Sequence, residues 1–446
     1  MTEFSELFSK WVNEKEIKVS ALAQFCGLDR PTVYKYLNGQ RLPATKELAE
    51  RIGEFLRLSP AQRQEFPEIY QITKMGKSTY QNRKRVRECL LGDWNEQKDD
   101  VKAPRNAGQN PALDARTAAV SGEEELEEAL GTLLLEESRK ERPLVLLIYQ
   151  PRFEFLRRFF TARAALFANT RVEHIICMNN EETHGGESEE NLNNLSQILP
   201  MYAHQLDYHP YYYYDKTDSH FYNLNLLPCM AAASDAVLLF HPEEKRGILI
   251  RDRQAVAMMK KQFYENKFYC QPLLQKGGAQ NLADACKRRG EGDGTMALIQ
   301  SGPVIPFPIP DGTDGIGMYF TEDGLRRFME MGVSTKDGYS RQDCLRILKE
   351  MTASDRVRPI LLRESYNGMN PVMHVWISMD FADFVLMDSQ QEPIHLFLKE
   401  RALVQLFYEF AESLDETQCF TWEESRNRLE QIGLEYEKRY RRLRNS

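Results

Sequence analysis

The segment Arg30–Arg41, RPTVYKYLNGQR, combines guanidinium, ammonium, hydroxyl and amide side chains in one short stretch. Proteins use these groups to donate hydrogen bonds to the phosphate oxygens and base edges of DNA. Val33 and Leu37 are four residues apart, so a helix brings them onto one face. With that face buried, the remaining side chains point outward: Arg30, Thr32, Tyr34, Lys35 and Asn38. We therefore expect the outward side of this helix to contact nucleic acid.

A second cationic stretch, Lys74–Arg87, contains six Lys or Arg residues and neither Asp nor Glu. Cations that neutralise phosphates release counterions from DNA, so one interpretation is an arm that clamps the DNA backbone. A solvated connector is the other interpretation, and the sequence leaves both open. On the first interpretation, Arg83, Lys84 and Arg85 contact the backbone.

Two short helices and a turn, within Val19–Pro43, are expected to position the first group of side chains. An amphipathic helix ends at Cys26, Gly27 makes the turn, and a second helix begins near Arg30. A glycine adopts turn geometries that other residues resist. Asp29 is a suitable cap for the second helix, and a proline is tolerated in the first turn.

The run SALAQFCGLDRPTVYKYLNGQRLP, followed by TKELAERIGEFL, resembles the Cro/XRE-type helix-turn-helix of bacterial and phage repressors. In that family, residues at the start of the second helix and one turn later reach base edges in the major groove. The resemblance therefore implies base contacts from Arg30, Thr32 and Lys35. It also implies that four residues touch the DNA backbone: Tyr34, Asn38, Gln40 and Arg41. A helical hairpin used for protein contact is the alternative.

Apolar residues recur at helical spacing on both sides of this motif. The apolar face of a first helix is formed by Phe4, Leu7, Phe8, Trp11 and Val12. Thr45 and Ser59 stand where caps would begin a fourth and a fifth helix. Residues 1–75 are therefore predicted to form an all-α helix-turn-helix domain.

The charge of the chain is unevenly distributed. The whole chain has a formal net charge of −8, whereas residues 1–94 contain 16 Lys or Arg and 12 Asp or Glu. The first part thus carries +4 and the remainder −12, and a basic head on an acidic body suits a polyanionic partner.

Several classes of protein do not fit the composition. No apolar run approaches the about 20 residues that a bilayer requires, and the N-terminus lacks the features of a signal peptide. The eight cysteines are scattered without a C-x-x-C pair, which favours reduced thiols in the cytoplasm over a zinc site. We expect no metal, no cofactor and no membrane partner.

Beyond the first domain, we expect a basic arm and linker over residues 76–121, followed by an α/β region. An apolar strand at Leu144–Gln150, a helix near Phe153–Phe167 and a strand at Val172–Met178 indicate a parallel sheet covered on both faces. The region divides into one half over residues 122–290 and a second over 291–446, which ends in a charged helix.

Two later segments of the α/β region are alike, which suggests an internal duplication. AVLLFH and GILIR precede a helix at Asp252–Phe268, and FVLM and IHLFL precede a helix at Glu400–Leu414. Two such halves resemble the phospholipase D-like fold. Catalysis in that family depends on an H-x-K motif in each half, and no H-x-K occurs here.

These observations predict a multi-domain, sequence-specific transcriptional regulator, either a repressor or an activator, that binds double-stranded DNA as a homodimer. Its α/β region would sense a small-molecule or peptide effector, mediate oligomerisation, or do both. No paired carboxylates, nucleophile elbow or metal cluster stands out in the sequence, so we do not expect an enzyme. Two alternatives stay open: a DNA-targeted hydrolase of unrecognised type, and a defence or antitoxin-like interaction scaffold.

Overall fold

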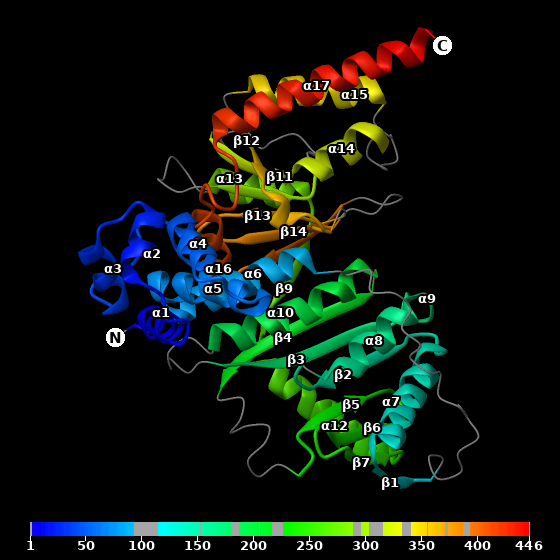
Figure 1. The fold of residues 1–446 in the computed structure, drawn as a ribbon. Helices are drawn as coiled ribbons and strands as arrows, with labels where there is room; N and C mark the ends of the chain where they lie inside the picture. The colour runs from blue at the N-terminus through cyan, green and yellow to red at the C-terminus, as the bar shows by residue number, and fades with distance from the viewer. Residues whose placement is uncertain are drawn as a thin grey trace. The chain divides into compact units, whose positions relative to one another are not determined.

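The computed structural model describes most of the chain (Figure 1). The described residues are 2–92, 115–151, 153–179, 187–204, 206–215, 226–288, 296–302, 315–331, 340–354, 356–370, 373–386 and 393–445. The chain divides into two compact units. We call Met1–Lys84 the N-terminal unit, and Arg85–Glu182 together with Glu187–Ser446 the C-terminal unit.

The N-terminal unit is entirely helical in its described residues. Its helices are α1 (Glu3–Glu14), α2 (Val19–Cys26), α3 (Arg30–Leu37), α4 (Lys46–Phe55), α5 (Pro60–Met75) and the first part of α6 (Lys77–Leu91). Phe66 of α5 lies at the centre of the core, where its ring stacks on Phe4 with centroids 4.9 Å apart. Thr2 and Ser59 form capping boxes that begin α1 and α5.

The C-terminal unit contains two mixed β-sheets. The first sheet has the spatial order β1 (Thr117–Ser121), β7 (Arg246–Ile250), β6 (Val237–His241), β5 (Cys229–Ala232), β2 (Leu144–Ile148), β3 (Arg171–Asn179), β4 (Asp207–Asp215), β8 (Gln271–Pro272). The second has the order β12 (Val357–Leu362), β11 (Ile316–Thr321), β10 (Ala297–Gln300), β13 (Met373–Ile377), β14 (Ala382–Leu386), β15 (Ile394–Leu398), β9 (Leu274–Gly277). As expected, β2 and β3 are parallel neighbours.

The two sheets share one topology. Strands β1 to β7 correspond in order to β9 to β15, and each pair of neighbours among β1 to β7 has its counterpart among β9 to β15; strand β8, next to β4, is an addition to the first sheet. The parallel pairs also correspond, since β2, β3 and β4 match β10, β11 and β12. The two closing segments that the sequence suggests as a duplication, β6–β7 and β14–β15, thus occupy corresponding places.

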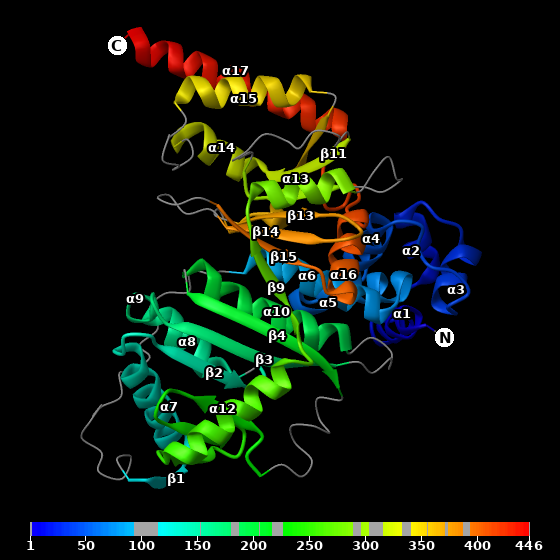
Figure 2. The same ribbon diagram turned by 180° about the vertical axis from the view of Figure 1, so that it is seen from behind.

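Helices cover both faces of each sheet (Figures 1 and 2). On the first sheet, one face packs on α7 (Glu123–Ser138), α8 (Glu154–Ala162), α9 (Ala164–Phe167) and α10 (Glu187–Ala203), and the other on α12 (Arg253–Lys267). On the second, one face packs on α13 (Ala279–Arg288), α14 (Glu322–Met331), α15 (Arg341–Ala353) and α17 (Trp422–Asn445), and the other on α16 (Arg401–Glu412). The chain is therefore an all-α unit joined to an α/β unit.

Three segments differ from the sequence-based expectation. The part of the expected arm at Lys77–Leu91 is helix α6, and Thr117–Ser121, expected within the linker, forms strand β1. Strand β9 and helix α13 precede residue 290 but belong to the second half, which therefore begins near Leu274. Residues 93–114 of the expected linker lie outside the described residues. Within the described part of the chain, every helix is too short or too polar to cross a bilayer.

Candidate nucleic-acid interface

Helices α2 and α3 are joined by a short turn at Gly27. This residue adopts the left-handed conformation, with φ 69° and ψ 32°, and closes α2 as its C-cap. The Asp29 carboxylate then begins α3 by accepting a hydrogen bond from the backbone N–H of Thr32 at 2.8 Å. Pro31 lies in the first turn of α3, where its missing N–H leaves no intrahelical bond unmade. The turn and both helix ends are thus fixed by local interactions.

The inward side of α3 belongs to the core of the N-terminal unit. Val33 is 1% exposed and Leu37 is 8% exposed, which confirms the predicted burial of both. Tyr36 is buried as well, although the sequence analysis did not identify it. These side chains pack in one cluster with Leu22 and Ala23 of α2. This packing determines which side of α3 faces solvent.

The outward side of α3 carries the residues that the sequence assigns to DNA. Arg30 and Lys35 are exposed, and Thr32 is half-buried at the first turn of the helix. The residues assigned to the DNA backbone are exposed as well: Tyr34, Asn38, Gln40 and Arg41. Among the ion pairs of the described residues, none involves Arg30, Lys35 or Arg41. These three cations are thus not held in ion pairs, and the nearest acid that interacts with one of them is Asp29, whose charge acts on Lys35 without a direct ion pair.

One acidic group lies at the start of α3. Hydrogen bonds from the hydroxyl and the backbone N–H of Thr32 lower the pKa of the Asp29 carboxyl below its usual value. The carboxylate therefore stays ionised at neutral pH, where its charge complements the positive end of the α3 dipole. It also engages Thr32, so Thr32 holds the helix end as well as facing outward.

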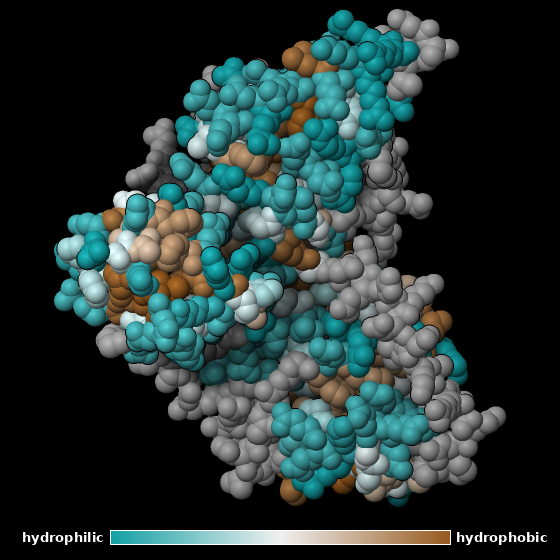
Figure 3. Space-filling view, in the orientation of Figure 1, coloured by the Kyte–Doolittle hydropathy of each residue, from teal (hydrophilic) through white to brown (hydrophobic). Residues whose placement is uncertain are grey.

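An apolar patch lies on the N-terminal unit over α2 and α4 (Figure 3). Phe25 of α2 is 42% exposed, and its ring packs on Phe55 of α4 with centroids 5.1 Å apart. The Arg51 guanidinium lies 5.7 Å from the centre of the Phe25 ring. Neither aromatic residue of this patch belongs to α3.

The residues of the second cationic stretch have other surroundings. Lys84 pairs with Glu68 at 3.4 Å, and half-buried Arg83 reaches the Met75 sulfur at 3.8 Å. Arg85 belongs to the C-terminal unit and pairs with Glu88 at 3.1 Å. The charges of Lys84 and Arg85 are therefore each partly neutralised by a neighbouring glutamate.

Comparison with known proteins gives only distant likenesses. No protein-family model and no curated protein matches the chain. Among solved structures, a polyphosphate kinase from Porphyromonas gingivalis is 12% identical with a TM-score of 0.25; the match covers 68% of this chain and 51% of the kinase. TrmBL2, an archaeal chromatin protein described as showing a novel mode of DNA binding, is 15% identical with a TM-score of 0.24; the match covers 60% of this chain and 98% of TrmBL2.

TM-scores this low assign neither a fold family nor a function to this chain. The chain also spans only about half the length of the polyphosphate kinase that it matches. The kinase is an enzyme, and its presence among the matches corrects the sequence-based expectation that excluded enzymes, but a likeness this low carries no activity over to this chain. We therefore drop that exclusion.

Proposed function

We propose that the chain is a sequence-specific DNA-binding transcriptional regulator in which α2, the Gly27 turn and α3 act as a helix-turn-helix. The observation that carries this proposal is the division of α3 into a buried apolar side and an outward side. On the outward side, Arg30 and Lys35 are exposed and form no ion pair within the described residues. A helix of this kind fits the major groove, which is wide enough to admit it.

In the proposed complex, Arg30, Thr32 and Lys35 read base edges. Arg30 and Lys35 are suited to donate to guanine O6 and N7, each worth roughly 1–3 kcal/mol of discrimination. A second set of exposed residues would hold phosphates and set the register: Tyr34, Asn38, Gln40 and Arg41. Glu68 and Glu88 compete with phosphate for Lys84 and Arg85, so we expect smaller contributions from Arg83, Lys84 and Arg85.

The α/β unit would hold two copies of the chain together as a dimer and would regulate DNA binding. One small helical unit offers a short contact with DNA, and two units on half-sites one helical turn apart bind far more tightly. We therefore propose a cytoplasmic homodimer whose C-terminal unit responds to an effector. The size of this unit, with two complete sheets, supports a role beyond holding the DNA-binding unit.

The experiment selects a duplex from a random library and measures its affinity by fluorescence anisotropy. Arg30→Ala and Lys35→Ala should each weaken binding about tenfold and relax the preference at one base pair. Lys10→Ala, at an exposed lysine of α1, is the matched control and should bind as the unaltered protein does. The proposal is wrong if the protein ignores duplexes at low salt, or if both variants keep the full sequence preference.

A further inference from the structure

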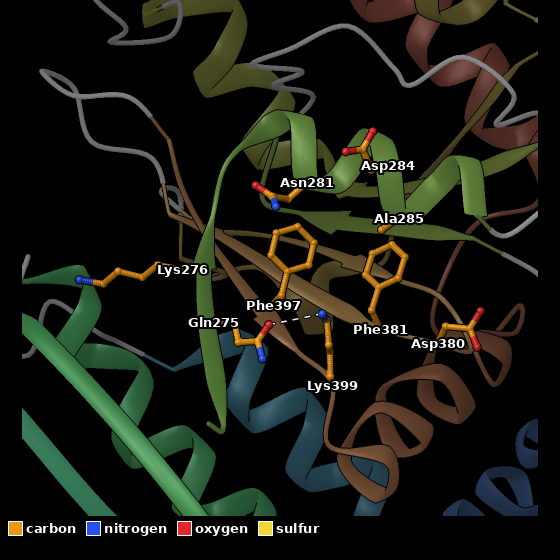
Figure 4. Close-up of a pocket in the computed structure, with 9 residues that line it drawn as sticks. All are labelled: Gln275, Lys276, Asn281, Asp284, Ala285, Asp380, Phe381, Phe397 and Lys399. Atoms are coloured by element: carbon orange, nitrogen blue, oxygen red, sulfur yellow. Dashed lines mark hydrogen bonds between the residues drawn. The ribbon is translucent and has the colours of Figure 1, made fainter. Parts of the chain in front are cut away.

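A pocket of about 460 Å³ opens on the second sheet of the C-terminal unit. Four segments surround it: strand β9, helix α13, the turn between β13 and β14, and the end of β15 (Figure 4). Its volume lies in the range of small-molecule sites in proteins. It belongs to one unit of the chain, so its shape does not depend on how the two units are placed.

The inner wall of the pocket is apolar. Phe381 and Phe397 lie there with ring centroids 6.2 Å apart, and each is only 5% exposed. Figure 4 shows both rings directed toward α13, where Ala285 lies above Phe381. Gly277 lets Phe397 take this place, because a Cβ at residue 277 would lie 2.8 Å from its ring. This wall suits an apolar body.

Charges of opposite sign flank that wall. On one side, Lys399 Nζ donates a hydrogen bond to Gln275 Oε1 at 3.3 Å. On the other side of Phe381 lies Asp380, and Asp284 of α13 lies above the rings (Figure 4). No ion pair among the described residues involves Lys399, Asp380 or Asp284. Asp284 accepts a hydrogen bond from Gln280 Nε2 at 2.8 Å. The pocket therefore offers the Lys399 ammonium on one side of the wall and the Asp380 carboxylate on the other.

Buried polar side chains lie next to the inner wall on the same face of the sheet. Asp383 is paired in register with Phe397, and its Oδ2 lies 2.6 Å from Nδ1 of His395. Both are nearly inaccessible, at 0% and 1% side-chain exposure. Asp383 Oδ1 has no hydrogen-bond partner among the described residues. An unpaired buried carboxylate oxygen is costly, so its presence calls for a reason beyond packing.

The first sheet is an internal control for this interpretation. Its corresponding strands β5, β6 and β7 face α7, α8 and α10 with apolar residues: Cys229, Ala231, Leu238, Phe240 and Leu249. The first sheet thus has the same topology with no acid or histidine on this face of strands β5, β6 and β7. Asp383 and His395 are therefore not required by the topology, and they lie on the face of the second sheet that bears the pocket.

We propose that this pocket binds a small zwitterion with an apolar body, that is, a free α-amino acid with an apolar side chain. The ligand carboxylate would meet Lys399 and the Gln275 amide, and its ammonium group would meet Asp380. The side chain would pack on Phe381 and Phe397. The amino acid would act as the effector of the regulator only if the proposed function above holds, whereas its binding to this pocket does not depend on that function.

The test titrates the full-length protein, without DNA, by calorimetry. L-phenylalanine, L-leucine and L-methionine are the probes, and N-acetyl-L-phenylalanine and L-phenylalanine amide each lack one of the two charges. We expect at least one free amino acid to bind at millimolar concentration or below, and each blocked form to bind about tenfold more weakly than its parent. The inference is overturned if no free amino acid binds, or if either blocked form binds as tightly as its parent.

Matched variants assign the binding to this pocket. Lys399→Met and Asp380→Asn should each weaken binding about tenfold. Lys261→Met on α12 and Asp323→Asn on α14 remove an exposed charge elsewhere in the same unit and should leave binding unchanged. Normal binding by Lys399→Met and Asp380→Asn would refute the assignment. Because duplex binding is measured separately without amino acid, a failure here is distinguishable from a failure of the DNA-binding proposal.

Discussion

Lowering the pH from 7 to 5 should destabilise the C-terminal unit through two buried histidines. His174 is fully enclosed on β3, with Nε2 2.9 Å from the Tyr149 carbonyl oxygen and Nδ1 2.6 Å from the Tyr208 hydroxyl. The carbonyl can only accept, so Nε2 carries the proton and Nδ1 accepts from the tyrosine. The neutral ring is thus fully hydrogen-bonded. If Nδ1 also carried a proton, that proton would have no hydrogen-bond acceptor unless the Tyr208 hydroxyl rotated.

Burial lowers the pKa of His174 from 6.5 to about 3, and that of His374 on β13 from 6.5 to about 4. A histidine with a lowered folded-state pKa stabilises the fold above its unfolded pKa, and this contribution is lost as the pH falls toward the folded value. At pH 5 the unfolded chain binds a proton at each site and the folded chain does not. Between pH 7 and pH 5, each histidine therefore lowers the free energy of unfolding by about 2 kcal/mol, and the two together lower it by about 4 kcal/mol.

Urea unfolding at pH 7, 6 and 5, followed by tryptophan fluorescence, measures this loss, because Trp376 is buried in the same unit. His174→Gln keeps a neutral polar group and should reduce the loss between pH 7 and 5 by about 2 kcal/mol. His209→Gln replaces a histidine that is not fully buried and serves as the control. If His174→Gln loses as much stability over this range as the unaltered protein, the reasoning from burial is wrong.

Three further outcomes follow from the geometry. Gly27→Ala should destabilise the N-terminal unit by about 1 kcal/mol in thermal unfolding, since Gly27 has φ 69° and no atom crowds its Cβ position. An unchanged melting temperature would contradict this. Arg41→Ala should weaken binding to all duplexes alike and flatten the plot of log affinity against log salt by about 1 per subunit, whereas a sequence-dependent loss would make Arg41 a base reader. Gly277→Ala should displace the Phe397 ring and weaken ligand binding in the pocket, as calorimetry would show.

The outward side of α3 was predictable from the sequence because the interactions that begin the helix and set its buried side are mostly local. The cap of Asp29, the left-handed Gly27 and the burial of Val33 and Leu37 all lie within one short stretch of chain. The pocket was not predictable. Its lining residues come from four segments between Gln275 and Lys399, and none of the segments carries a motif. Only the pairing of β9 with β15 and the packing of α13 bring them together.

The duplication could be detected in the sequence only where both copies have the same surroundings. Asp252 and Glu400 each accept two backbone N–H bonds at the start of α12 and α16, so an acid recurs before a helix in both halves. On the opposite face the copies diverge, because Asp383 and His395 lie where the first sheet is apolar. Edge strands β1 and β9 escaped detection since each has at most five residues and few buried side chains. The two sheets thus share a topology but differ in the side chains of one face. We expect this difference if that face only packs against helices in the first sheet and also binds a ligand in the second.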